Sequence, residues 1–288
     1  MEENIVVKEK KKLNIFIKIF IVLITFILLL FCYMYFIENK LLITNEFAVV
    51  NSNIPSSFNG FKIVQFSDIH FGRTTNEKEV TKVVETINLN KPDILVFTGD
   101  LFDSYINLSD ENIEFLKSEL SKTTATIGKY AIKGDSDYLN INKYEEIMTE
   151  AGFTILNNQN IPIYYKDSTP IFISGIPSAS HNEQDISKAF EKGLDGNYYQ
   201  IMLIHEPILF QDVKGQANLV LAGHTLGGLI NIPFIGGIIK KENTSKYIVG
   251  KYESGDSTLY VSNGIGTENI SLRFHNIPSI SLYRIYNY

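Results

Sequence analysis

The sequence predicts an α/β domain that follows one N-terminal membrane helix. Three observations lead to this prediction. Residues 19–37 form an uncharged apolar run, short apolar runs then alternate with helical patterns, and the last third of the chain is nearly all strand pattern. Such alternation favours parallel strand pairing with crossover helices. From the residues alone, the simplest arrangement is a sheet built from both halves, with helices on its outer faces.

Composition narrows the class of protein. The chain has 288 residues, and the roughly 245 that follow the apolar run are enough for one well-buried domain. A hydrophobic content of 44% and a charged content of 20% exclude a disordered chain. The net charge of −6 argues against a nucleic-acid partner, which would need a basic face. Cys32 stands alone, so no intrachain disulfide can form.

The N-terminal segment has the properties of an uncleaved anchor. About 19 apolar residues at a rise of 1.5 Å nearly span a hydrocarbon core of about 30 Å. Tyr33 and Tyr35 stand near the far end of residues 19–37, where an aromatic belt is expected. A cleaved signal peptide would need small residues at the cut site, which this segment lacks. A buried soluble helix is rarely apolar all round over this length. We therefore expect residues 19–37 to lie in the lipid bilayer.

The charges around the anchor predict its orientation. Residues 1–18 form a basic N-terminus that we expect in the cytoplasm, because lysines gather on the cytoplasmic side of membrane helices. These lysines are Lys8, Lys10, Lys11 and Lys12. The prediction is a single-pass protein of the cytoplasmic membrane, with its C-terminal domain on the extracytoplasmic side.

Residues 38–60 read as a connector, and residues 61–288 as the α/β domain. In chain order we expect strands at 61–66, 93–97 and 126–132, a hairpin within 161–175, and strands at 200–204, 219–222, 247–252, 259–262 and 279–285. Helices are expected near 80–87, 113–120, 143–151 and 185–194, where apolar residues recur at helical spacing.

Side chains of metal-ligand type follow five of these strands. Ligand sites in open α/β sheets gather beyond the carboxyl ends of strands. Singly, a Gly-Asp pair is usually a turn and a lone histidine is usually structural. Together, the carboxylates would repel one another unless cations neutralise them, and mixed Asp and His ligands suit Mn, Fe or Zn. The residues are Asp68, His70, Asp100, Asp135, His205 and His224.

The order of these motifs resembles the calcineurin-like metallophosphoesterases, and most closely their bacterial branch with a single N-terminal transmembrane helix. The family signature is D-x-H, G-D-x-x-D, G-N-H-D/E, H and G-H-x-H. Here it reads Asp68-x-His70, Gly99-Asp100-x-x-Asp103, Gly134-Asp135-Ser136-Asp137, His205 and Gly223-His224-Thr225-Leu226. The resemblance implies a β-sandwich flanked by helices on both sides, with a two-metal centre between the sheets.

The resemblance also implies roles for these residues. Asp68 and His70 would bind a first divalent ion, Asp135, His205 and His224 a second, and Asp100 would bridge the two. Asp100, Asp137 and Ser136 are the implied catalytic positions. The ions, Mn, Fe or Zn, would hold a phosphoryl group and activate a water for in-line attack.

Three positions depart from the family pattern. Asp135 stands where Asn is usual and adds a negative charge, while Ser136 replaces the histidine that contacts phosphate and assists the leaving group. Leu226 replaces a histidine ligand of the first ion, which should therefore bind weakly unless His181, His275 or water fills the gap. We expect activated leaving groups to be favoured, because serine is a poor general acid.

The expected function is hydrolysis of a phosphoester or diphosphate bond, on a phosphorylated small molecule or on a lipid-linked or envelope substrate. The alternative is a catalytically impaired relative that binds a phospho-ligand as a sensor, and a third reading is a membrane-tethered structural module. Arg73 and Arg273 are candidate phosphate contacts. The apolar loop 232–239 is either core or a membrane contact. The sequence does not define the oligomeric state.

Overall fold

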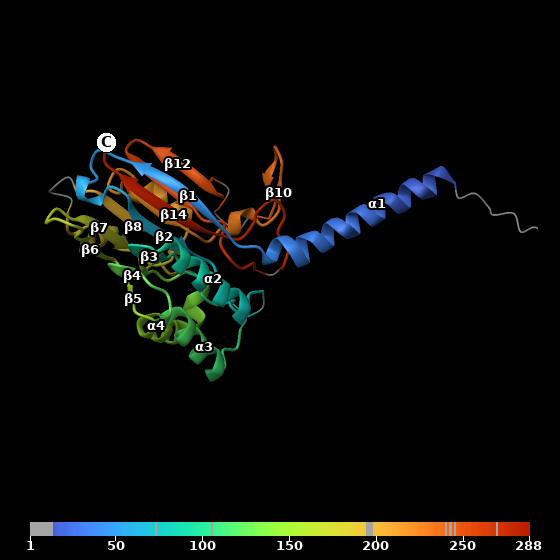
Figure 1. Cartoon of the computed structure of the whole chain (residues 1–288), viewed down its shortest axis with the longest axis horizontal. Coiled ribbons are helices and arrows are strands. Elements are labelled where there is room, and N and C mark those ends of the chain that lie inside the picture. Colours follow the sequence, from blue (N-terminus) through green and yellow to red (C-terminus); the bar gives the residue numbers. More distant parts are fainter. Residues whose placement is uncertain are drawn as a thin grey trace, which may run out of the picture.

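A computed structural model describes residues 14–72, 74–104, 106–193, 198–239, 241, 244, 246–268 and 270–288. A long helix projects from one end of a domain made of strands and shorter helices (Figure 1). Arg73 and most of the basic N-terminus lie outside the described residues, so the predictions made for them have no structural counterpart here.

Two six-stranded sheets form the centre of the domain. The first has the order β1-β14-β2-β3-β4-β5, and the second has the order β12-β13-β9-β8-β7-β6. In the first sheet the strands are β1 (Ile43–Val50), β2 (Phe61–Phe66), β3 (Ile94–Phe97), β4 (Gly128–Ala131), β5 (Phe153–Ile155) and β14 (Ser279–Tyr286). In the second they are β6 (Gln159–Ile163), β7 (Ile171–Gly175), β8 (Gln200–Leu203), β9 (Leu219–Ala222), β12 (Gly250–Ser254) and β13 (Ser257–Val261).

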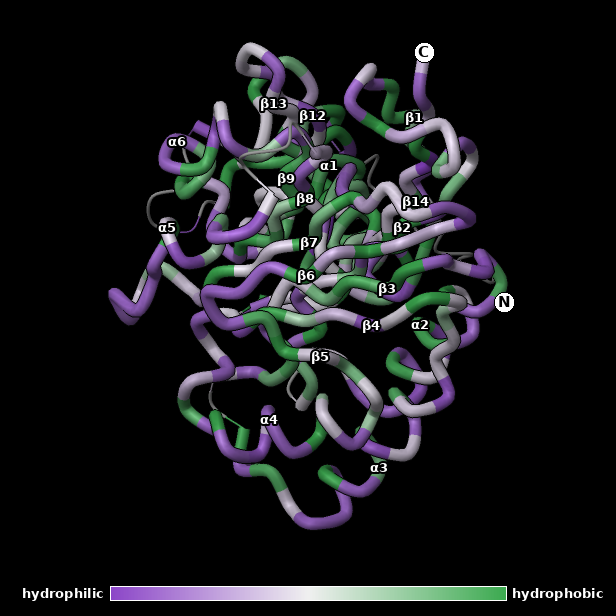
Figure 2. The backbone as a smooth tube through the Cα atoms, turned by 90° about the vertical axis from the view of Figure 1, so that its left-hand side faces the viewer, coloured by the Kyte–Doolittle hydropathy of each residue, from purple (hydrophilic) through white to green (hydrophobic). Residues whose placement is uncertain are grey.

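Helices cover the outer face of each sheet (Figure 2). On the first sheet lie α2 (Glu77–Asn90), α3 (Asp110–Ser121) and α4 (Ile141–Glu150), and beside the second lie the short helices α5 (Ile186–Ala189) and α6 (Phe210–Val213). Alternation along the strands produces these layers: on β3, Ile94 and Val96 pack between the sheets, while Leu95 and Phe97 pack under the helices.

The predicted fold class is confirmed: the domain is an α/β sandwich with helices on both sides. The simpler prediction of one sheet from both halves was wrong, because strand patterns do not reveal which strands pair. Only β14 crosses from the C-terminal part into the first sheet, where it pairs with β1 and β2. The predicted connector also contains β1, an edge strand parallel to β14.

Some element boundaries differ from the prediction. The strand expected at 247–252 is β12, Gly250–Ser254, and the helix expected at 185–194 covers only Ile186–Ala189. The expected hairpin is present as β6 and β7, which pair antiparallel. A small hairpin of β10 (Asn231–Ile232) and β11 (Gly236–Gly237) lies within the apolar loop.

The N-terminal helix begins earlier than predicted. The helix α1 (Ile15–Cys32) continues through one wide turn, Tyr33–Ile37, and one tight turn, Glu38–Lys40. The whole stretch, Ile15–Lys40, is long and apolar enough to cross a membrane, and none of its most apolar window is buried against the domain. Lys18 therefore lies within the helix rather than before it.

The end of this helix is fixed to the domain. Glu38 is buried and accepts a hydrogen bond of 2.7 Å from the backbone N–H of Asn276. Asn39 donates to the carbonyl of Ser271, and Lys40 forms an ion pair of 2.9 Å with Glu79 on α2. The last turn of the helix is thus part of the domain, not a free linker.

Candidate metal centre

All six predicted ligands meet at one end of the sandwich. Asp68 and His70 follow β2, while Asp100 and Asp135 follow β3 and β4 of the same sheet. His205 and His224 follow β8 and β9 of the other sheet. Within the described residues they form two groups whose ligand atoms lie within 4.8 Å of one another. The first site holds Asp68, His70 and Asp100, and the second site holds Asp100, Asp135, His205 and His224.

Asp100 belongs to both sites. Its Oδ2 lies 3.6 Å from Nε2 of His70 and 3.3 Å from Nε2 of His205. Oδ1 of Asp135 lies 2.9 Å from Nε2 of His205 and 3.1 Å from Nδ1 of His224. Carboxylate and imidazole donors of both sheets therefore converge with one shared carboxylate between them.

The donor atoms of the first site fit a bound cation. Among the described residues, Oδ2 of Asp68 and both ring nitrogens of His70 are buried without a hydrogen-bond partner. Burying unpartnered polar atoms is costly, and a divalent metal would give them a partner. Oxygen and imidazole donors of this kind suit Mn, Fe or Zn.

The backbone of the ligands is unusual. Asp68, His70, Asp100 and His224 have φ values of 54°, 48°, 63° and 71°, in the left-handed region that non-glycine residues seldom adopt. Each such residue costs on the order of 1–3 kcal/mol, and such outliers cluster at functional sites. The turns after β2, β3 and β9 thus hold side chains in position at the expense of local stability.

Two glycines allow the ligand turns to approach each other. A Cβ atom at Gly134 would lie against Oδ1 of Asp100, and one at Gly223 would lie against Oγ of Ser67, well inside contact distance. Gly134 directly precedes the ligand Asp135, and Gly223 directly precedes the ligand His224. A larger side chain at either position would clash, so both glycines are required by space and not only by turn geometry.

Asp137 lies beneath the centre. Its Oδ2 accepts hydrogen bonds of 2.9 Å from the N–H groups of Asp100 and Gly134, and its Oδ1 accepts one of 2.8 Å from Leu101. Burial, reinforced by the charge of Asp100, raises the pKa of Asp137 to about 7. We had expected Asp137 among the catalytic positions, but this geometry makes it a positioning residue that ties two ligand turns together.

Ser136 and Leu226 are both buried at the centre. The hydroxyl of Ser136 donates to the carbonyl of Phe102 at 2.8 Å, and its N–H donates to Oδ1 of Asp100 at 3.0 Å. The Ser136 proton thus points to the backbone, which argues against the predicted catalytic role. A Cβ atom at Gly264 would meet both Cβ of Asp68 and Cδ2 of Leu226 at 3.0 Å, so leucine fills space next to the first site.

The substitutes considered for the missing histidine lie elsewhere. His181 is exposed and stacks on Tyr138, with 3.6 Å between the two ring centroids. His275 is exposed near the end of α1. Neither belongs to the groups of metal-type ligands found within the described residues. Arg273 is fully buried and donates to the carbonyls of Asn263, Gly266 and Asn276, so it is not the predicted phosphate contact.

Lys241 is a residue of the centre that sequence reasoning missed. Its Nζ lies 3.6 Å from Oδ2 of Asp100, 4.0 Å from Oδ1 of Asp135 and 3.1 Å from Oε2 of Glu268. No family motif contains Lys241, which follows the apolar loop in the sequence. The only hint was electrostatic, because the additional carboxylate of Asp135 calls for a nearby cation.

Charges at the centre strongly perturb one another. Burial would raise the pKa of Asp100, but the positive charges of His205 and Lys241 outweigh it and hold the pKa well below its ordinary value. Burial would lower the pKa of His205, but Asp100 and Asp135 raise it far above its usual range. The centre therefore stabilises positive charge, as a cation site should.

Comparison with known proteins agrees with this geometry. The sequence pattern of the family described as calcineurin-like phosphoesterase matches residues 61–228, which is more than half of the chain. The chain belongs to the calcineurin-like phosphoesterase family. Membership implies a metal-dependent hydrolase of phosphoric esters, and the Asp and His groups are positioned for metal binding.

Relatives of this chain occur in bacteria and animals. It is 32% identical over 256 residues to "Uncharacterized metallophosphoesterase YkuE" of Bacillus subtilis, covering 88% of each chain. It is 29% identical to "Uncharacterized metallophosphoesterase Cj0846" of Campylobacter jejuni, covering 92% of this chain and 70% of the relative. A Bos taurus protein described as "Transmembrane protein with metallophosphoesterase domain" is 25% identical and covers 79% of this chain and 53% of its own.

A pocket of about 370 Å³ opens at the candidate metal centre. Its lining includes Asp135 and His224 of the second site, together with Lys241, Glu206 and Glu268. Glu206 is largely buried and accepts a hydrogen bond from the N–H of Ala179. This hydrogen bond joins the loops that follow β7 and β8. The pocket thus offers two metal ligands and one ammonium group to a ligand from solvent.

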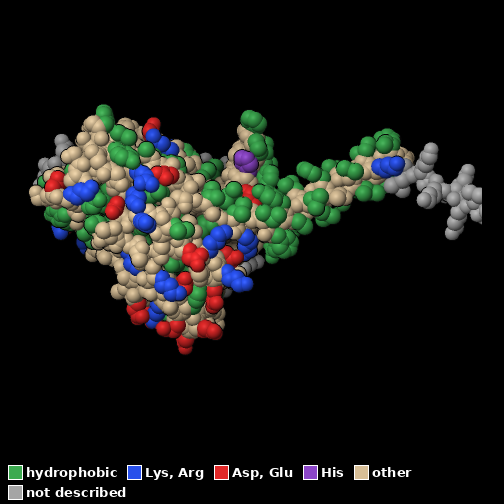
Figure 3. All heavy atoms as spheres, in the orientation of Figure 1, with side chains coloured by type: hydrophobic (Ala, Val, Ile, Leu, Met, Phe, Trp, Pro, Cys, Tyr) green, Lys and Arg blue, Asp and Glu red, His purple; other side chains and the backbone are tan. Residues whose placement is uncertain are grey.

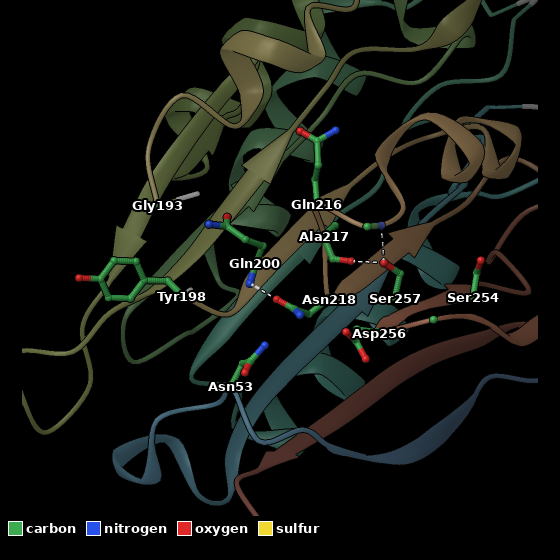
Figure 4. A pocket seen from close by; sticks show the side chains of 12 residues that line it. Asn53, Gly193, Tyr198, Gln200, Gln216, Ala217, Asn218, Ser254, Asp256 and Ser257 are labelled. Carbon is green, nitrogen blue, oxygen red and sulfur yellow. Dashed lines mark hydrogen bonds between the residues drawn. The ribbon is translucent and has the colours of Figure 1, made fainter. Parts of the chain in front are cut away.

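A second pocket, of about 290 Å³, lies at the opposite end of the second sheet (Figure 4). Gln200 begins β8 and Asn218 directly precedes β9, so this pocket lies at the amino ends of strands whose carboxyl ends carry His205 and His224. Its described lining holds one carboxylate, Asp256, and no histidine. It is therefore not a metal site of the family type.

Proposed function

We propose that the chain is a membrane-anchored, metal-dependent phosphoesterase that hydrolyses a phosphoester or diphosphate bond with a metal-activated water. The observation that carries the proposal is the pair of ligand groups sharing the buried Asp100. Two divalent ions fit this pair, and Mn, Fe or Zn suit its donors. Bound metal would activate water and stabilise charge on the phosphoryl oxygens.

The protein's own residues would orient the substrate. Lys241 and His224 line the pocket, where an ammonium group can pair with phosphoryl oxygens that face solvent. A fixed charge of this kind stabilises the charge of the transition state more strongly in a partly buried site than in water. Asp135 holds His205 and His224 through its Oδ1, and Asp137 fixes the backbone of Asp100.

The departures from the family pattern favour particular bonds. Because the hydroxyl of Ser136 donates to the carbonyl of Phe102, no histidine or serine proton serves the leaving group at this position. Loss of a positioned general acid lowers the rate of hydrolysis by about 10²–10⁴-fold when the leaving group needs a proton. Diphosphates and aryl esters need that proton least, so they are the proposed substrate class.

The anchor places the proposed substrate at a membrane. The helix Ile15–Lys40 would span the cytoplasmic membrane, and the lysines before it would keep the N-terminus in the cytoplasm. The phosphoesterase domain would then act outside the membrane, on a phosphorylated lipid-linked or envelope compound. An epitope placed after Tyr288 should be digested by protease added to intact cells, and protection of that epitope would contradict this orientation.

The experiment that tests the activity is manganese-dependent hydrolysis of an aryl phosphodiester by the full chain in detergent. Asp100→Asn should abolish turnover, because both sites lose their shared ligand. Asp256→Asn, which alters a carboxylate of the remote pocket, is the matched control and should leave turnover unchanged.

A second candidate function is binding of a phospho-ligand without turnover. The burial of Leu226 beside the first site favours it, since leucine cannot ligate. A folded chain that binds manganese but does not hydrolyse the ester would favour this candidate and contradict the enzyme.

A further inference from the structure

The hairpin formed by β10 and β11 carries a group of exposed apolar side chains, among them Phe234, the most exposed large apolar residue of the described chain. The exposed fractions of Phe234, Ile235 and Ile238 are 109%, 73% and 53%. Residues 229–239 contain no charged side chain, and Lys240 and Lys241 follow directly in the sequence. A contiguous exposed apolar patch usually marks an interaction surface, and basic residues beside such a patch suit lipid head groups.

The base of this hairpin is joined to the segment that holds the end of the anchor. The N–H of Asn231 donates to the carbonyl of Phe274 at 2.8 Å, and the N–H of Phe274 donates to the carbonyl of Leu229 at 3.0 Å. Two residues later, the N–H of Asn276 donates to Glu38 at the end of the helix. Hairpin and anchor are therefore fixed to one short stretch of chain.

The hairpin and the anchor also share one side of the molecule. The hairpin projects from the end of the domain from which α1 leaves (Figure 1), and apolar side chains cover both α1 and the hairpin's outer end (Figure 3). Elsewhere in the described domain, exposed apolar residues such as Leu89, Leu139 and Tyr164 belong to separate elements: α2, the turn before α4, and the segment after β6. The continuity of hairpin and anchor identifies one partner, the lipid bilayer.

We propose that the tip of the β10–β11 hairpin inserts into the same bilayer as α1 and forms a second membrane contact. This inference rests on the proposed anchoring by α1. The hairpin follows the His224–Gly228 turn and precedes Lys241, so both of its ends lead into the metal centre. Insertion would hold the pocket of Lys241 and His224 at the membrane surface, within reach of a phosphate on a lipid head group.

The absence of tryptophan from the chain allows a direct test. Phe234→Trp places a single tryptophan at the hairpin tip of the full chain, which is reconstituted in phosphatidylglycerol–phosphatidylcholine vesicles. Phe26→Trp reports the anchor, because Phe26 lies on the exposed surface of α1. Tyr164→Trp reports solvent, because Tyr164 is exposed and directly follows β6, a strand on the side of the domain away from α1 (Figure 1).

The measurement is quenching of tryptophan emission by lipids brominated on their acyl chains. We expect Phe234→Trp to have blue-shifted emission and to be strongly quenched, as Phe26→Trp should be, while Tyr164→Trp stays unquenched. Quenching at Phe26→Trp alone would overturn the hairpin contact and leave the anchor intact. No quenching at Phe26→Trp would overturn the anchoring and the hairpin contact with it. Blue-shifted but unquenched emission at Phe234→Trp would indicate a protein partner and also overturn the inference.

Discussion

Nζ of Lys241 lies 4.0 Å from Oδ1 of Asp135, the residue that stands where the family usually has asparagine. The additional carboxylate and the additional ammonium group therefore meet at the same point of the metal centre. Burial would lower the pKa of Lys241, but Asp100, Asp135 and Glu268 raise it far above its ordinary value, so the ammonium group stays charged. Lys241 thus offsets the negative charge that Asp135 introduces.

Replacing this lysine should separate metal binding from turnover. Lys241→Met removes a positive charge near Asp100 and Asp135, so manganese should bind about tenfold more tightly, a change of about 1.4 kcal/mol. Hydrolysis should fall by about 10²-fold, because a cation that faces the phosphoryl oxygens is lost. Calorimetric titration with manganese and kinetics with the aryl ester measure the two effects. Lys251→Met, at an exposed lysine on β12, is the control, and weaker metal binding in Lys241→Met would contradict the charge argument.

Leu226 accounts for the expected weakness of the first metal site. It is 2% exposed and lies close to the side chain of Asp68, where it offers no ligand atom. Leu226→His should tighten binding of the weaker ion by about tenfold, or about 1.4 kcal/mol. Metal content after dialysis, measured by atomic emission, checks this.

Ile238→His is the control for Leu226→His, because it adds an imidazole at an exposed position outside the turns that carry the ligands. Equal metal retention in the two variants would mean that position 226 does not face the first ion.

The leaving-group preference attributed to Ser136 can be tested with matched esters. The wild-type chain should hydrolyse an aryl phosphodiester much faster than an alkyl one, because Ser136 has its proton committed to Phe102. Ser136→His should raise the alkyl rate by about 10²-fold and change the aryl rate little. Comparison of kcat for the two esters is the measurement, and equal rates in the wild-type chain would refute the preference.

Most of the metal centre could be predicted because its ligands lie in short motifs at strand ends. Gly99-Asp100 and Gly134-Asp135 each follow a buried run, and the carboxyl ends of parallel strands meet at one edge. Lys241 could not be predicted in this way. It reaches the centre from an irregular loop, and its only signal was a charge imbalance at Asp135.

The strand β1 shows a second limit of the sequence. Residues Ile43–Val50 are mostly exposed, and only Val49 is buried, so their hydrophobic pattern is weak. Their partner β14 lies more than two hundred residues away and pairs in parallel, which no local pattern can reveal. Pairing over such distances is a property of the whole fold.

Asp137 should matter for stability rather than for substrate contact. Its two carboxylate oxygens accept three backbone N–H groups from the turns that carry Asp100 and Asp135. Asp137→Asn would set an amide N–H₂ group against these donors and should reduce the free energy of unfolding by about 2–4 kcal/mol. Urea unfolding of the full chain in detergent measures this. Asp212→Asn, at an exposed position of α6, should change nothing, and an equally stable Asp137→Asn would contradict the positioning role.

Glu38 should control how firmly the N-terminal helix is held to the domain. Its carboxylate accepts from the N–H of Asn276, whose side-chain amide donates to the carbonyl of Leu226 in the histidine turn. Glu38→Leu leaves that buried N–H without an acceptor, at a cost of about 1–3 kcal/mol. The last helical turn should then open more often, and trypsin should cleave after Lys40 about tenfold faster or more. Glu46→Leu, which breaks only an exposed ion pair with Arg284, is the matched control. Unchanged cleavage in Glu38→Leu would show that the other contacts of this turn suffice, whereas faster cleavage with weaker manganese binding would show that the anchor's end and the metal centre are coupled through Asn276.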